Sequence, residues 1–177
     1  MAEPGGDDGA PADAGGPPDL GEDGALAAIE MMSGWINNAD GKIGILGAAL
    51  VVLGGAMVGQ RGRVGEIIDH PGARGIVGLV LLGGSAVTLA VAAVNLFLAV
   101  WPRLPDPGPS RFSFPYLARV PLAELIDAPP GELRRDAWRQ AQTLARVAKA
   151  KFQGFARALS AGALAATLFV AWSIVAT

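Results

Sequence analysis

Three long apolar runs restrict the fold of this chain more than any other feature. Ile43–Gly59 has about 17 residues, Ile76–Trp101 about 26 and Ala158–Ala176 about 19, and none of them holds a charged residue. A helix needs roughly 20 apolar residues to cross the hydrocarbon core of a bilayer. The polar remainder of a 177-residue chain is too short to cover three such helices in water. We therefore predict an all-α integral membrane protein with transmembrane helices at about residues 43–60, 76–101 and 157–176.

Two of the predicted spans continue into amphipathic helices. Residues 25–42 carry Leu26, Ile29, Met32 and Ile36 at the spacing of one helix face. A second apolar stripe precedes the third span; its members are Leu133, Ala137, Ala141, Leu144, Ala148, Phe152 and Phe155. No breaker separates this stripe from the span, so we predict one helix from about Glu132 to the C-terminus. The two stripes need apolar partners, and each is the nearest candidate for the other, as a small helical bundle outside the membrane.

The remaining segments are polar and rich in glycine or proline. Residues 1–24 are acidic and built from Gly, Pro and Ala, so we predict a disordered tail, with a single membrane module over residues 25–177. The stretch between the first two spans is predicted to be a short loop. In the segment 102–156, prolines predict a loop at the start and leave room for a short helix at 122–126.

The distribution of basic residues predicts the orientation. Nine Lys or Arg residues lie between Pro102 and Gln153, whereas the first loop has three and the C-terminal end has none. By the positive-inside rule, the N-terminus and the long polar segment face the cytoplasm. The three arginines of the first loop, at 61, 63 and 74, argue mildly against this orientation.

No group of residues suggests catalysis. His70 is the only histidine and the chain has no cysteine, so we expect no enzyme activity, metal, cofactor or nucleic-acid partner. Asn95 is the most notable polar residue within a span, and we expect it to serve interhelical packing rather than a water-filled path. The spans lack ionisable residues, which disfavours an ion-coupled transporter.

A polar cluster stands where the first span begins. Asn38, Asp40 and Lys42 lie against the first apolar run, and Lys151 lies at a similar position before the third. The cluster is either a plain boundary between water and lipid or a functional contact, with Lys151 as the expected partner of Asp40.

A second charged feature, which we call the basic face, lies opposite the apolar stripe of the last helix. It consists of Arg134, Arg135, Arg139, Arg146 and Lys149. One side of any amphipathic helix must face water, and this is the simplest interpretation of the basic face. The alternatives are contacts with anionic lipid headgroups, with a nucleotide phosphate or with the acidic tail.

Four short motifs resemble the Pycsar effector family of the transmembrane type. They are "INNADGKIGIL" at the first span, "WPR" after the second, "FSFPYLARVPLAEL", and "QAQTLARVAKAKFQGFARAL" before the third, in the family's order. The resemblance implies a bacterial antiphage effector of the inner membrane, whose functional partner is a nucleotide cyclase encoded nearby. Its activating ligand would be cyclic CMP or cyclic UMP, and its effect would be to impair the membrane. The positions that the motifs mark are Asn38, Asp40, Lys42, Pro102, Arg103, Gln140 and Lys151, with Arg103 also a candidate anion contact.

Two further expectations concern assembly and the competing function. Three apolar spans leave no polar lumen in one copy, so we predict a homo-oligomer that packs through small residues and the stripe from Leu133 to Phe155. The small residues are Gly47, Gly55, Gly59, Gly84, Ala86, Ala90, Gly162 and Ala166. The alternative function is a non-catalytic membrane anchor or scaffold that recruits a partner through its cytoplasmic helices.

Overall fold

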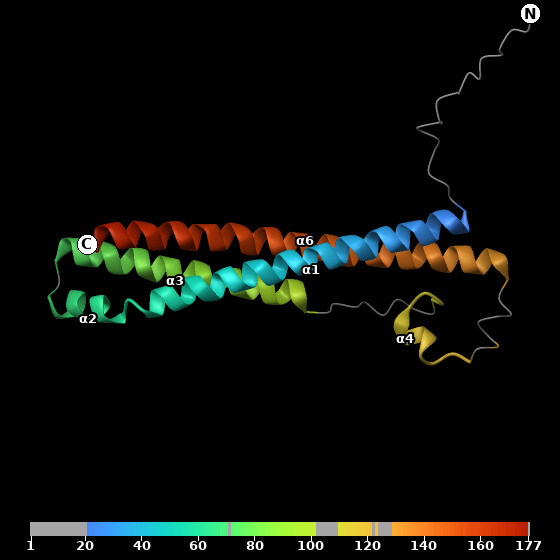
Figure 1. Cartoon of the computed structure of the whole chain (residues 1–177), viewed down its shortest axis with the longest axis horizontal. Coiled ribbons are helices and arrows are strands. Elements are labelled where there is room, and N and C mark those ends of the chain that lie inside the picture. The colour runs from blue at the N-terminus through green and yellow to red at the C-terminus, as the bar shows by residue number, and fades with distance from the viewer. Residues whose placement is uncertain (1–20, 71, 102–109, 122, 124–128, 177) are drawn as a thin grey trace, which may run out of the picture.

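The described part of the protein is a bundle of long helices (Figure 1). The computed structural model describes residues 21–70, 72–101, 110–121, 123 and 129–176. The helices within these ranges are α1 (Glu22–Val58), α2 (Arg61–Asp69), α3 (Ala73–Val100), α4 (Phe114–Leu117) and α6 (Pro130–Val175). Helices α1, α3 and α6 are long and apolar enough to cross a membrane. The predicted all-α membrane fold with three spans is confirmed.

Helix α6 is the longest described helix and packs against both α1 and α3. Helices α1 and α6 run in parallel, and α3 runs antiparallel to both (Figure 1). The 46 residues of α6 extend roughly 69 Å at 1.5 Å per residue, about twice the hydrocarbon core. Among the long helices that the structure describes, α3 ends at Val100, so α1 and α6 alone extend beyond the membrane half of the bundle.

Both predicted continuous helices are present. Helix α1 passes from its amphipathic part into the span without a break, although Gly41 and Gly44 lie at the join. Helix α6 begins with Pro130 in its first turn, where the missing N–H costs nothing, and runs to Val175. The membrane halves expose large apolar side chains, with Ile45 74% and Val51 75% exposed. Such surfaces suit contact with lipid tails.

Small residues form the interface between α3 and α6. Every seventh residue of α3 is buried, namely Gly78, Ser85, Ala92 and Ala99. Small side chains let two helices approach closely, which drives packing where the hydrophobic effect is weak. Ser85 Oγ also donates a hydrogen bond to the backbone oxygen of Ala165, at 2.7 Å, across this interface.

Two sequence predictions differ from the structure. The predicted first loop contains a helix, α2, whose Ile67 packs closely against Gly75 at the start of α3. One member of the predicted α1 stripe is misplaced: Leu26 is 40% exposed, whereas Ala25 is buried on the face that Ile29, Met32 and Ile36 share. Alanine is a weak hydrophobic signal, yet its size allows α1 to lie close to α6.

Several predictions lie outside the described residues. These are the disorder of most of the acidic tail, the roles of Pro102 and Arg103, and the short helix at 122–126, of which only Ala123 is described. The division into a tail over 1–24 and a module over 25–177 therefore stays a prediction.

Candidate functional site

An ion pair joins α1 and α6 shortly before the charge-free stretch of each helix. Lys151 Nζ lies 2.5 Å and 2.7 Å from the two carboxylate oxygens of Asp40. The side chain of Lys151 is 17% exposed and that of Asp40 is 47% exposed, so the pair is partly shielded from water. This is the pairing that the sequence predicted, and it fixes the register of two parallel helices at one level.

The other members of the predicted entry cluster do not join this pair. Asn38 and Lys42 are exposed on α1, and neither makes a hydrogen bond or ion pair with another residue that the structure describes. A functional role for Asn38, Asp40, Lys42 and Lys151 stays a prediction, although the contact between two of them is observed.

An aromatic contact supports the same helix pair on its water side. The rings of Trp35 on α1 and Phe152 on α6 meet edge to face, with centroids 5.9 Å apart. Met32 and Ala148 complete a shallow apolar hollow around them. Trp35 remains half exposed, so the contact between α1 and α6 is thin at this point.

The segment before α6 docks onto the first turns of that helix. Ser110 Oγ lies 3.5 Å from the backbone oxygen of Asp136, and Arg111 pairs with Glu132 at 3.6 Å. Two polar atoms are buried here without a hydrogen-bond partner among the described residues, Arg111 Nη1 and Gln140 Oε1. Buried polar atoms without partners are rare in native proteins and suit contact with water or a polar ligand.

The basic face is confirmed as an exposed surface. All five members, from Arg134 to Lys149, are exposed on α6, and Arg139 makes a weak ion pair with Asp136 at 3.8 Å. At 100° per residue, Arg135, Arg139, Arg146 and Lys149 share one side of the helix, while Arg134 lies a quarter turn away. The structure does not gather them around a cavity, so their role in anion binding stays a prediction.

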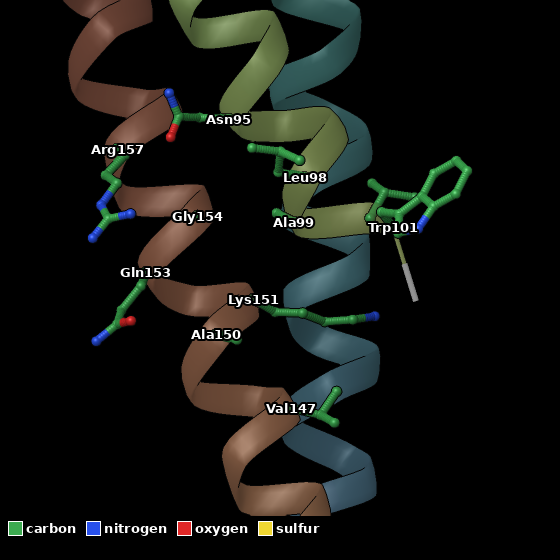
Figure 2. A pocket seen from close by; sticks show the side chains of 11 residues that line it. Asn95, Leu98, Ala99, Trp101, Val147, Ala150, Lys151, Gln153, Gly154 and Arg157 are labelled. Atoms are coloured by element: carbon green, nitrogen blue, oxygen red, sulfur yellow. The ribbon is translucent and has the colours of Figure 1, made fainter. Parts of the chain in front are cut away.

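A groove between α3 and α6 lies at the C-terminal end of α3 (Figure 2). It encloses about 290 Å³, and its polar lining comes from Asn95, Trp101, Lys151, Gln153 and Arg157. Asn95 Nδ2 donates to Val91 O of its own helix at 2.8 Å rather than across the interface. Lys151 extends from α6 towards α1, whereas Arg157 and Gln153 lie on the opposite side of α6 (Figure 2).

Two residues of this groove were not predicted from the sequence. Arg157 is the last charge before the third span, and this position was a usable signal. Gly154 was not among the small residues singled out from the sequence, yet a Cβ there would lie 2.7 Å from Ala99 Cβ, so only glycine permits the observed approach. The pattern of small residues four apart, Gly154 and Ala158, could have indicated this.

Together these features define a class: a multi-pass helical membrane protein whose first and last spans extend into water as a paired helical stalk. A family model for the Pycsar effector protein domain matches residues 24–177, and the chain belongs to that family. No curated protein and no solved structure matches the chain. The protein is thus an effector of a cyclase-linked antiphage system, located in the bacterial inner membrane.

Proposed function

We propose that the protein impairs the inner membrane, without catalysis, when cyclic CMP or cyclic UMP binds to its cytoplasmic part. Family membership supports the effector role. The observation that carries the mechanism is the continuity of α1 and α6 from water into the membrane. A change in how these helices pair outside the bilayer must move the spans to which they are joined.

The cytoplasmic stalk, where α1 and α6 lie beyond the end of α3, is held by few apolar groups. Its buried apolar residues are Ala25, Ala39, Ala137, Ala141 and Ala148. Each buried methyl group contributes about 0.8 kcal/mol. Suppose that α1 and α6 pair in two ways, at rest and when activated. To move the ratio of these two states from 1:99 to 99:1, a ligand must favour the activated state by about 5.5 kcal/mol. A ligand with micromolar affinity binds with about 8 kcal/mol. This exceeds the energy needed for the shift, provided that most of it is gained in only one arrangement of α1 and α6.

The surface where residues 110–121 dock onto α6 is the candidate sensor. The unpartnered Nη1 of Arg111 offers a donor for a phosphate, and Oε1 of Gln140 offers an acceptor one helical turn beyond Asp136. The nearby basic face adds a positive potential that attracts an anionic nucleotide. The elements that the structure describes are all helices, so we place the site on the stalk itself.

Membrane damage requires more than one copy or a defect in the bilayer. The described core of the membrane half consists of small and apolar side chains around Ser85, which offer no water-filled path. Within one copy, α1 already covers the stripe of α6, and Gly47, Gly84 and Gly162 already face leucines of neighbouring helices. We therefore assign the contacts between copies to surfaces that remain open, such as Gly55 and Ala90. This replaces part of the predicted interface.

The test uses living cells with an inducible cyclase. Induction of a cyclase that makes cyclic CMP or cyclic UMP should depolarise cells carrying the protein, as read by a membrane-potential dye, whereas an adenylate cyclase should not. Arg111→Gln should weaken the response, and Arg119→Gln, an exposed arginine of the same segment, should leave it unchanged.

Three results would contradict the proposal. Depolarisation without any cyclase, or equally with an adenylate cyclase, would remove the link to a pyrimidine nucleotide. Unchanged potential with every cyclase, together with recovery of a bound partner protein, would favour the anchor or scaffold instead. Nucleotide binding to purified Arg111→Gln protein at the unchanged affinity would exclude the docking surface as sensor.

A further inference from the structure

We propose that the groove between α3 and α6 binds an anionic phospholipid of the cytoplasmic leaflet. The phosphate would contact Arg157 and Gln153, and one acyl chain would lie over Ala161 and Leu164. This site is independent of the nucleotide response, because it lies in the membrane half and on the side of α6 away from Asp40.

The groove has two adjoining compartments of different chemistry. The compartment near the water boundary, about 290 Å³, is lined by Gln153 and Trp101 together with Asn95 and Arg157. The second, about 550 Å³, is lined mainly by small and apolar residues and shares Asn95 and Arg157 with the first. The first compartment is the more polar of the two, although Leu98 and Val147 also line it. A hollow with several polar groups that continues into an apolar one fits a molecule with an ionic head and a hydrocarbon tail.

The depth of Arg157 explains why a lipid is the occupant. A Cβ on Gly154 of α6 would lie 2.7 Å from Ala99 Cβ and 3.4 Å from the backbone oxygen of Asn95, so the helices are close at this level. Arg157 therefore starts about one turn further into the membrane half. Trp101, at the end of α3, marks the interface, where amphipathic rings favour the headgroup region. The guanidinium of Arg157 therefore extends along the groove towards the phosphates, as long basic side chains do at membrane boundaries.

The charge of Arg157 is not balanced within the described chain. No Asp or Glu that the structure describes pairs with it, whereas the nearby Lys151 is already paired with Asp40. At 100° per residue, Arg157 and Gln153 continue the side of α6 that carries Arg135 and Arg146. An anionic headgroup supplies the missing charge and gains about 1 kcal/mol for each basic residue near the surface.

The apolar compartment opens towards the bilayer rather than towards water. Its wall residues Val91 and Leu164 are 47% and 50% exposed on the membrane half of the bundle. A nucleotide or a free phosphate has no group to fill this compartment, and an acyl chain from the surrounding leaflet does.

Lipid retention on the full-length protein tests the proposed contact between the phosphate and Arg157. The protein is released from nanodiscs holding equal amounts of phosphatidylglycerol and phosphatidylcholine, and bound lipids are counted by native mass spectrometry. Arg157→Gln should lower the preference for phosphatidylglycerol about fivefold, the ratio that matches about 1 kcal/mol. Arg135→Gln, which removes the same charge further from the membrane, should leave it unchanged. Equal retention of both lipids by the unaltered protein, or equal losses in both variants, would overturn the site.

A second pair of variants tests the acyl half. Ala156→Phe places a ring in the apolar compartment and should displace the lipid, whereas Ala163→Phe adds the same ring at an exposed position outside it. Helical content by circular dichroism checks that both variants fold. Continued retention in Ala156→Phe would refute the acyl position. Complete displacement of the lipid by soluble glycerol phosphate would assign the groove to free phosphates instead.

Discussion

Replacing Gly154 with alanine should destabilise the bundle selectively, because two helices touch at this point. An added Cβ would lie 2.7 Å from Ala99 Cβ and 3.3 Å from Ala99 Cα. Carbon atoms are in favourable contact at about 3.5–4.0 Å, so α3 and α6 must separate by roughly 1 Å. The neighbouring atoms belong to or adjoin the backbone, so no flexible side chain can move away instead.

The magnitude follows from comparison with Gly83→Ala. A Cβ at Gly83 meets nothing within 4 Å. Both substitutions gain the same helix propensity, about 0.5–1 kcal/mol, so their difference isolates the cost of overpacking, about 1–3 kcal/mol. Gly162→Ala should fall between them, because its contact, at 2.9 Å, is with the end of the flexible Leu50 side chain.

The assay is reversible unfolding of the purified protein in one detergent, followed by tryptophan fluorescence and by far-ultraviolet circular dichroism. Gly154→Ala should unfold at a lower denaturant concentration than Gly83→Ala, with similar slopes. Equal stability of these two variants would show that α3 and α6 do not pack as closely as described, and the reasoning on the small-residue interface would fail.

Three further predictions concern the ion pair, the interface and the topology. A double-mutant cycle of Asp40→Asn and Lys151→Gln should give a coupling free energy of about 0.5–1 kcal/mol in the same unfolding assay. A coupling near zero would show that the ion pair does not stabilise the contact between α1 and α6. Ser85→Ala should cost about 1 kcal/mol by loss of its bond across the helices; a neutral result would mean that this bond contributes nothing. Because the chain has no cysteine, single cysteines can report topology: one at Ala176 should react with an impermeant thiol reagent in intact spheroplasts, and one at Gly131 only after permeabilisation. The opposite pattern would reverse the predicted orientation.

The sequence predicted the parts of the fold that the membrane imposes. Charge-free runs as long as Ile76–Trp101 have few alternatives to spanning helices, since backbone groups in lipid must bond within the helix. The pairing of Asp40 with Lys151 was also predictable, because each charge stands just before a span and both spans enter from the same side. The depth of each charge relative to the predicted span was therefore enough to predict this contact, without knowledge of how the helices pack.

The remaining features depend on how the helices rotate about their axes, which the sequence pattern does not fix. The predicted stripe of α1 began at Leu26, but the structure buries Ala25 instead, whose hydrophobic signal is too weak to stand out in the sequence. Helix α2 was missed because Gly62 and Gly65 lower its helix propensity, while its contact with Gly75 is tertiary. The groove at Arg157 arises from two helices distant in sequence, so neither helix shows it alone.

We propose that a cyclic pyrimidine nucleotide makes this protein impair a bilayer. The most direct measurement uses the purified chain in liposomes of bacterial inner-membrane lipids that hold a self-quenched dye. Addition of cyclic CMP or cyclic UMP should release the dye within minutes, and cyclic AMP at the same concentration should not. If the liposomes retain the dye in the presence of both pyrimidine nucleotides, with the protein shown to be inserted and folded, the proposed function is wrong.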